Sequence, residues 1–295
     1  MALGGVAFDV PSDLLESDWW DALGPTVGRS LDFPYPVDDS KNVFGKPNGR
    51  EGAARTIAGL LGTLPHCAER SFGCIEPLVE AIAVCCLDEV RAEHWFAERP
   101  SLSLSADGGL CEAMNRLGVT IATAAFDLLF PRRFNRLLRE FDNKADVERS
   151  ALEPLLKRLL SDPAAPEEIR IVVDRLGGRK FYRAIVETIA GDAFVLTSVE
   201  TPALSRYVFE LDGRRIEVSF AVAADGFSLP VAFASMVAKY LRECAMAGFN
   251  AYWVKRVPGL KPTAGYYADA YRFRRDVGKR LKEFGVTKAE FWRDR

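Results

Sequence analysis

The chain has 295 residues, of which 48% are hydrophobic and 27% are charged. This length allows one large domain or two ordinary ones, with enough apolar side chains for a sizeable core. No uninterrupted apolar run approaches the roughly 18 residues that a membrane-spanning helix needs. The first residues also lack the basic and apolar regions of a signal peptide. We therefore expect a cytoplasmic protein that does not contact membranes.

The net charge is only −2, but it is unevenly distributed. Residues 239–295 contain 14 Lys and Arg against 6 Asp and Glu, a balance of +8, so residues 1–238 carry −10. A basic C-terminal quarter beside an acidic body suits a polyanionic partner with a carboxylate-rich site next to it. A solvated basic helix at the C-terminus explains the same charges equally well.

The six cysteines and two histidines do not have the spacing of a structural zinc site. No two cysteines form a Cys-x-x-Cys pair, and His66 and His94 lie 28 positions apart with no ligand pattern around them. The adjacent Cys85 and Cys86 lie in an apolar run and are expected to be buried free thiols, which indicates a reducing compartment.

The N-terminal half is predicted to hold two strands with helices between them. In chain order, the expected elements are a strand over Gly5–Val10, a helix over 12–23, a loop over 24–50, helices over 51–65 and 75–98, a Ser- and Gly-rich connection over 99–111, and a strand over Val119–Phe130.

The C-terminal half is predicted to alternate strands and helices. A helix over 144–161 precedes a β-branched strand over Ile169–Asp174, a helix over 179–190, a strand over Ala193–Val199 and a hairpin over Phe209–Phe220 that turns at Asp212-Gly213. A strand–helix–strand unit implies that its two strands pair in parallel. A carboxylate at the end of such a strand, as at Asp174, is typical of a site in an α/β sheet.

A mostly apolar helix over 231–243 carries a polar stripe. Ser235, Lys239, Arg242 and Glu243 recur at spacings that keep them on one side of the helix. A glutamate at the end of a buried helix needs a partner, such as a cation or a metal ion. A last turn that simply reaches solvent is the alternative interpretation.

Three segments, in order, resemble ribonuclease HII, the type 2 ribonuclease H family. They are the strand that ends in Asp174, the helix with Ala234-Ser235-Met236-Val237-Ala238-Lys239 that closes with Arg242-Glu243, and the loop Pro262-Thr263-Ala264-Gly265-Tyr266. Asp39-Ser40-Lys41 and Phe134-Asn135 are similar to two further segments of the family. The resemblance covers most of residues 5–275.

The resemblance implies an α/β fold and a reaction. The fold is the ribonuclease H-like mixed sheet of five strands flanked by helices, here as one domain over 1–295 with a helical insertion near 50–115 and a basic region near 245–295. The reaction is endonucleolytic cleavage of RNA in an RNA/DNA hybrid or a ribonucleotide-containing duplex. Carboxylates would hold two Mg²⁺ or Mn²⁺ ions about 4 Å apart.

The resemblance also assigns residues. Asp174 and Glu243 match catalytic metal ligands, and Glu243 stands where the family has aspartate. The residues that match nucleic-acid contacts are Ser40, Lys41, Asn135, Ser235, Lys239 and Tyr266. A turn-forming role for Asp174, a solvated turn at Ser40-Lys41 and loop packing by Tyr266 are the alternatives.

One motif of the family is missing. The first strand of the family carries Asp-Glu-Ala-Gly and supplies half of the metal site, whereas Ala2–Phe8 resembles the stretch that follows it. Because that strand is central, its absence predicts a slot in the sheet. Three explanations are open: the printed start is late, another segment fills the slot, or the protein is a degenerate relative that binds nucleic acid without cleaving it. A different nuclease on the same sheet is a further alternative.

Overall fold

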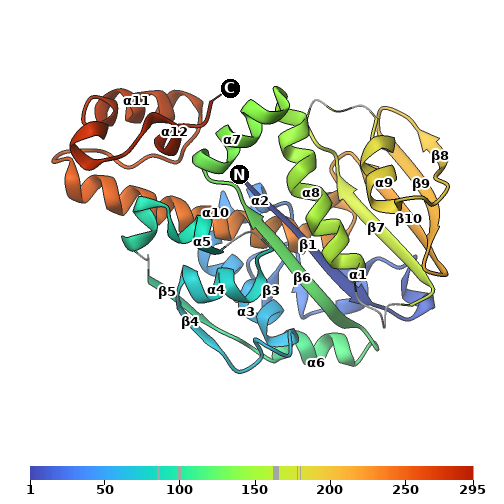
Figure 1. Cartoon of the computed structure of the whole chain (residues 1–295). Helices are drawn as coiled ribbons and strands as arrows, with labels where there is room; N and C mark the ends of the chain where they lie inside the picture. Colours follow the sequence, from blue (N-terminus) through green and yellow to red (C-terminus); the bar gives the residue numbers. More distant parts are fainter. Residues whose placement is uncertain (85–86, 99–100, 162–165, 178, 180, 295) are drawn as a thin grey trace.

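The computed structural model describes residues 1–84, 87–98, 101–161, 166–177, 179 and 181–294. It is a mixed α/β structure in which several small sheets lie among helices (Figure 1). Cys85 and Cys86, expected to be buried thiols, lie outside the described residues. Among the described helices, none is both long and apolar enough to cross a lipid bilayer.

The strands that matter for the site belong to two sheets. β1 (Ala2–Asp9) pairs antiparallel with β6 (Thr120–Leu128), with Ala2 opposite Leu128. The second sheet has the order β7-β10-β9-β8. Its members are β7 (Glu168–Asp174), β8 (Leu196–Glu200), β9 (Leu204–Leu211) and β10 (Arg214–Ala221). The described strands therefore do not form the expected single five-stranded sheet.

The hairpin expected at Asp212-Gly213 is confirmed. β9 and β10 pair antiparallel across it, and both turn residues have positive φ, 51° at Asp212 and 76° at Gly213. A two-residue turn with positive φ at both positions matches the twist of the strands.

The parallel pairing expected between β7 and β8 is wrong. β7 pairs in parallel with β10, and β8 lies at the far edge of the sheet against β9. The tight β9–β10 hairpin occupies the two positions between them. Helix α9 (Arg183–Ala190) links β7 to β8 and packs its apolar side chains on β9.

Two long helices cover opposite faces of β1. Helix α8 (Lys144–Leu160) lies on one face, where a Cβ at Gly5 would meet Leu159 at 2.6 Å. Helix α10 (Leu229–Arg256) lies on the other, where a Cβ at Gly4 would come within 3.1 Å of the Ala234 carbonyl oxygen. The two glycines therefore let both helices approach the strand closely.

Several expected helices are interrupted. The helix expected over 12–23 is a 3₁₀ turn, Ser12–Leu14, followed by α1 (Trp19–Leu23), which begins at the Asp18 cap. The helix expected over 75–98 is α4 (Ile75–Ile82), α5 (Leu87–Arg91) and a 3₁₀ segment, His94–Glu98. The connection expected over 99–111 contains β5 (Ser101–Ser105), which pairs with β4 (Ser71–Cys74).

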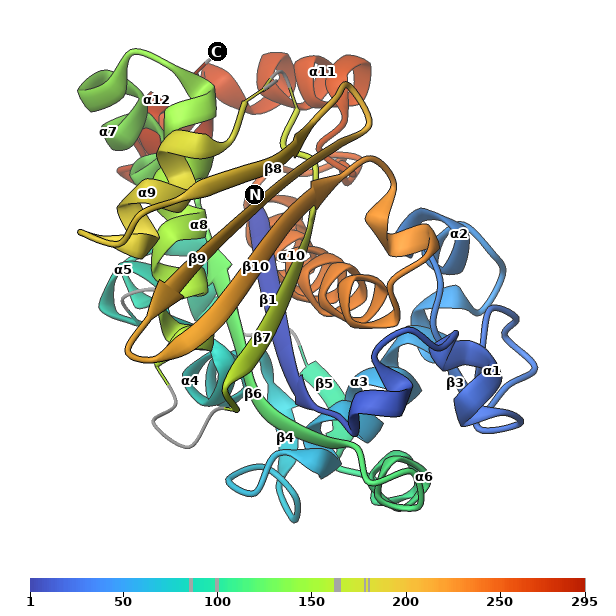
Figure 2. The same ribbon diagram turned by 90° about the vertical axis from the view of Figure 1, so that its right-hand side faces the viewer.

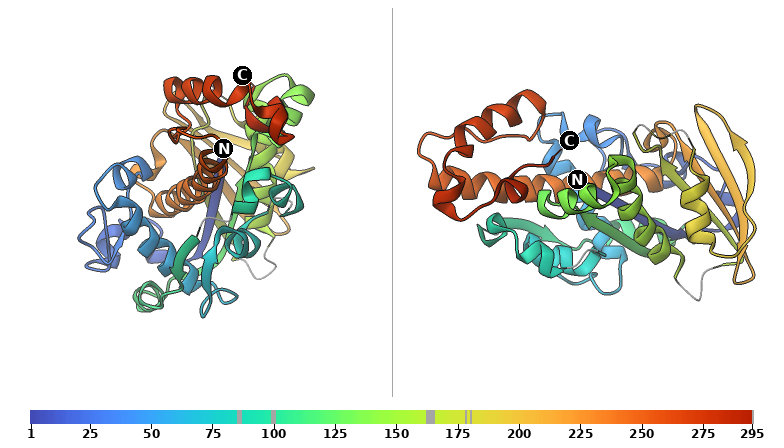
Figure 3. Two further views of the ribbon diagram at one scale, coloured as in Figure 1. Left: turned by 90° about the vertical axis from the view of Figure 1, so that its left-hand side faces the viewer. Right: turned by 45° about the horizontal axis from the view of Figure 1, so that its top comes forward.

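The remaining elements complete the two ends of the molecule. They are β2 (Val27–Gly28), β3 (Tyr35–Pro36), α2 (Ser40–Phe44), α3 (Gly49–Thr63), α6 (Gly109–Asn115), α7 (Pro131–Phe141), α11 (Tyr267–Gly278) and α12 (Lys288–Phe291), with 3₁₀ segments Ala224–Gly226 and Leu281–Phe284. The basic C-terminal region gathers at one end of α10 (Figure 3) around an aromatic core that includes Trp253 and Phe291.

Candidate functional site

A cavity of about 690 Å³ separates the two sheets along the full length of β1 and β7. It is lined by every residue from Ala2 to Val10 and from Glu168 to Leu176. Figure 2 shows the two strands running in opposite directions, with α10 beside them. Within the described residues, no strand pairs with the second edge of either one. We call this cavity the slot.

Asp174 lies at one end of the slot. Its Oδ1 accepts a hydrogen bond from the backbone N–H of Ala224, 3.1 Å away, which ties the end of β7 to the segment before α10. Burial, followed by the nearby Asp39 and Asp174 carboxylates, raises the pKa of Asp225. Lys41 acts in the opposite direction. The charges of Asp39, Asp174 and Lys41 therefore all act on Asp225, although only Asp174 of these residues lines the slot.

Glu243 has cations as partners within its own helix. Its Oε1 lies 2.6 Å from Arg242 Nη1 and 3.4 Å from Lys239 Nζ. The partner that the sequence requires for this glutamate is therefore provided by two basic side chains.

The described residues do not fit the two-metal centre that the resemblance implies. No group of three or more His, Cys, Asp or Glu side chains in the described part of the chain is arranged to hold a metal ion. Asp174 accepts a backbone hydrogen bond and Glu243 is held by Arg242 and Lys239. Two such ions need several oxygen ligands in one place.

Ser40 and Ser235 are brought together across 195 positions of sequence. Their hydroxyl oxygens lie 3.1 Å apart, which joins the start of α2 to the second turn of α10. Asp39 caps α2 by accepting a hydrogen bond from the Lys41 backbone N–H at 2.8 Å. The Lys41 side chain is exposed, whereas Ser40 is buried.

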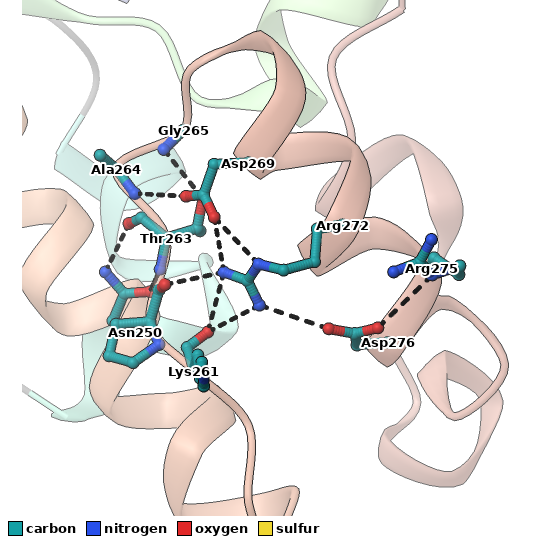
Figure 4. Close-up of polar contacts among 10 residues, drawn as sticks. Asn250, Lys261, Thr263, Ala264, Gly265, Asp269, Arg272, Arg275 and Asp276 are labelled. Atoms are coloured by element: carbon teal, nitrogen blue, oxygen red, sulfur yellow. Dashed lines mark hydrogen bonds and ion pairs between the residues drawn. The ribbon is translucent and has the colours of Figure 1, made fainter.

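Tyr266 directly follows a loop that three side chains hold in place. Figure 4 shows the polar contacts of this loop, which involve Asn250, Asp269 and Arg272. Thr263 exchanges two backbone hydrogen bonds with the Asn250 side chain and donates its hydroxyl to Asp269 over 2.6 Å. This hydrogen bond, followed by Arg272, lowers the pKa of the Asp269 carboxyl. Arg272 also donates to the Lys261 and Pro262 carbonyl oxygens. The loop is therefore rigidly attached to α10 and α11.

The Tyr266 ring lies beside two cations of α10. Lys239 Nζ donates to the tyrosine hydroxyl over 2.8 Å, and the Arg242 guanidinium lies 5.2 Å from the ring centroid. Arg242 also donates to the Ala264 carbonyl oxygen. Tyr266 nevertheless stays 59% exposed, so much of its ring faces solvent. An exposed aromatic ring next to two cations can contact both the bases and the phosphates of a nucleic acid.

Asn135 is not available for the contact that the resemblance assigns to it. The side chain is fully buried, donates to the carbonyl oxygens of Ala289 and Trp292, and accepts from the Asp294 N–H. All its polar atoms hold the C-terminal segment against α7. The motif Phe134-Asn135 therefore has a structural role here.

Two residues at the site were not assigned from the sequence. Arg242 contacts Glu243, Tyr266 and Ala264, and its spacing of three from Lys239 on the same helix was the available signal. Asp225 precedes α10 in a 3₁₀ turn, and nothing in its local sequence indicates that it lies beside Asp174. Comparisons of the chain with protein-family models, curated proteins and solved structures find no match.

Proposed function

We propose that the chain is a ribonuclease HII-type protein that binds an RNA/DNA hybrid or a ribonucleotide-containing duplex at the surface formed by Lys239, Arg242 and Tyr266. The observation that carries this proposal is the exposed Tyr266 ring fixed between two cations. Aromatic rings stack on bases or pack on riboses, and Lys and Arg neutralise phosphates. The +8 balance of residues 239–295 supports a polyanionic ligand.

The proposal extends to a ribonuclease H-like arrangement of strands. A mixed sheet that contains β7 and β10, with Asp174 at a strand end and α10 crossing beside it, agrees with the order of elements that the resemblance implies. Ser40 and Ser235 meet at 3.1 Å and Lys239 reaches Tyr266. Segments far apart in sequence that match the family therefore lie together in space.

Cleavage is the part of the proposal that these residues do not support by themselves. The expected reaction needs Mg²⁺ or Mn²⁺, and the described carboxylates do not form a centre for these ions. We therefore propose duplex binding as the function that these residues support, and we assign Lys239, Arg242 and Tyr266 to positioning the duplex. Asp174, at the end of the slot, remains the candidate catalytic carboxylate.

The experiment is a binding measurement with a labelled RNA/DNA hybrid, followed by fluorescence anisotropy. Lys239→Met keeps the aliphatic stem and removes the charge, so we expect a loss of affinity of about 3- to 10-fold, the effect of one phosphate contact. Lys157→Met removes an exposed charge on α8 and serves as the matched control. Equal effects of the two substitutions would contradict the proposed surface.

A further inference from the structure

The slot exposes two strand edges that face each other. In a strand, the backbone N–H and C=O groups of alternate residues point toward opposite neighbours. β1 uses one edge for β6 and β7 uses one edge for β10. About half of the backbone polar groups of each strand therefore point into the slot. Backbone groups without partners are costly when they are buried.

The length of the slot matches one strand. It extends along the eight residues of β1 and the seven of β7. A cavity of about 690 Å³ is far larger than a packing defect and falls in the range of sites that hold a bound molecule.

Helices α8 and α10 cover the two faces of the slot. Leu155, Leu156 and Leu159 of α8 line one face, and Val231, Ala234 and Ala238 of α10 line the other. These helices already contact β1, and α8 reaches the core on β7, β9 and β10 through Leu152, Leu156 and Leu160. Both helices therefore span the gap between β1 and β7.

We propose that the slot receives an extended polypeptide segment from outside residues 1–295, which adds a strand between β1 and β7 and joins the two sheets into one. This inference does not rest on the proposed nucleic-acid binding. It is a case of strand addition, in which backbone hydrogen bonds provide the affinity and side-chain pockets the specificity.

Other occupants fit the slot less well. An apolar small molecule would cover the leucine and alanine side chains, but would leave the edge N–H and C=O groups without partners. An edge strand of a second folded copy brings its own sheet and helices, and α8 and α10 close both faces against them. A free extended segment satisfies the edges and fits between the helices.

The walls define the chemistry of the segment. Because helices cover both faces, its centre is continuously apolar, as in buried strands of α/β sheets. One end of the slot carries Lys239 and Arg242, and the other carries Asp9 and Glu168. The first end also carries Asp174 and Arg175, and the second also carries Arg170. Ion pairs reduce this asymmetry, because Glu243 pairs with Lys239 and Arg242, and Glu168 pairs with Arg170 and Arg215. A segment with an acidic residue facing Lys239 and Arg242, and a basic residue at its other end, complements the rim.

The test uses a labelled synthetic peptide with an apolar β-branched core of about seven residues, one terminal Asp and one terminal Lys. We expect saturable binding to the 295-residue chain and at least about tenfold slower amide hydrogen exchange in β1 and β7. A peptide with proline in its centre cannot pair there and is expected not to bind. Replacing the terminal Asp by Lys is expected to weaken binding, and unchanged affinity would contradict the charge argument.

A variant of the protein provides the second arm. Ala238→Phe places a ring in the slot and is expected to abolish peptide binding, whereas Ala251→Phe, at an exposed position of the same helix, is expected to leave it intact. Circular dichroism checks that both fold. The proposal is overturned if the edge amides of β1 and β7 are already protected in the chain alone. It is also overturned if dodecanoate binds in the slot and the peptide does not. Hybrid binding, measured separately with Tyr266→Ala at a position outside the slot lining, distinguishes this failure from a failure of the proposed function.

Discussion

Lys239 Nζ donates a hydrogen bond to the Tyr266 hydroxyl over 2.8 Å, linking the middle of α10 to a loop 27 positions later. The same hydrogen bond, the largest cause, lowers the pKa of the Tyr266 phenol. Lys239 and Tyr266 were separate matches in the sequence, one on a helix and one in a loop. The hydrogen bond shows that they lie side by side and form one surface. Arg242 completes this surface from the next turn of the helix.

Tyr266→Ala tests the aromatic part of this surface. The ring is 59% exposed, so its removal should change the free energy of unfolding by only about 0.5 kcal/mol. Loss of a base or ribose contact should lower affinity for an RNA/DNA hybrid by about 1 to 3 kcal/mol, or roughly 5- to 150-fold. Anisotropy with hybrid and with DNA duplex measures both the loss and the selectivity. A hybrid affinity that matches the unsubstituted chain would remove Tyr266 from the interface.

Salt dependence tests the role of the basic C-terminal quarter. If Lys and Arg of residues 239–282 neutralise phosphates, the logarithm of the binding constant should fall linearly with the logarithm of the salt concentration. Lys239→Met should reduce the slope by about one. A titration between low and moderate salt provides the slope, and a flat line would contradict phosphate binding by these residues.

Asp174→Asn tests the carboxylate at the end of the slot. The amide oxygen of asparagine can still accept from the Ala224 N–H, so we expect the thermal unfolding midpoint to be nearly unchanged. If the chain, with the strand peptide bound or without it, shows Mn²⁺-dependent cleavage of a hybrid, the substitution should abolish it. Persistent cleavage by the variant would show that Asp174 is not part of the reaction.

The burial of Glu93 predicts that the free energy of unfolding depends on pH. The side chain is 3% exposed and its Oε2 has no hydrogen-bond partner among the described residues. Burial raises the pKa of its carboxyl to about 8. The positive charge of Arg132, the second cause in size, acts in the opposite direction. The folded state therefore binds more protons than the unfolded state between about pH 4.5 and 8, so stability is lost as pH rises through this range.

Glu93→Gln removes this titration. We expect the variant to be more stable than the unsubstituted chain at pH 8 by about 1 to 3 kcal/mol, and to lose the decline of stability between pH 5 and 8. Urea unfolding at a series of pH values measures both effects. Glu283→Gln, at an exposed position, is the matched control. Parallel pH curves for Glu93→Gln and the control would contradict the buried protonated carboxyl.

The close packing around Gly4 predicts that a larger side chain at this position destabilises the fold. A Cβ at this position would lie 2.2 Å from the ring of Phe126, which is fully buried, and 3.1 Å from the Ala234 carbonyl oxygen. Gly4→Val should therefore lower the free energy of unfolding by about 1 to 3 kcal/mol. Gly177→Val meets nothing within 4 Å and serves as the comparison in thermal unfolding. Equal unfolding midpoints would show that β1 can move away from α10.

Local patterns predicted the separate elements well where one periodicity dominates. The strands β1, β6 and β7, helix α8 and the hairpin at Asp212-Gly213 follow from apolar runs, helical periodicity and a turn dipeptide. The broken helices near α1 and α4 were missed, because their interruptions depend on caps such as Asp18 and on the bridge between Ala83 and Phe126 of β6. Pairing partners far apart in the chain leave no local periodicity.

The site shows the same division. The sequence by itself determined that Ser235, Lys239, Arg242 and Glu243 share one side of a helix, because helical spacing is a local property. The absent central strand stays an expectation of the resemblance, and the structure has a slot between β1 and β7. Only the tertiary structure decided that β8 lies away from β7, that Asn135 is buried, and that Glu243 pairs with Lys239 and Arg242. These outcomes depend on which surfaces exclude water together, and that is a property of the whole packed chain.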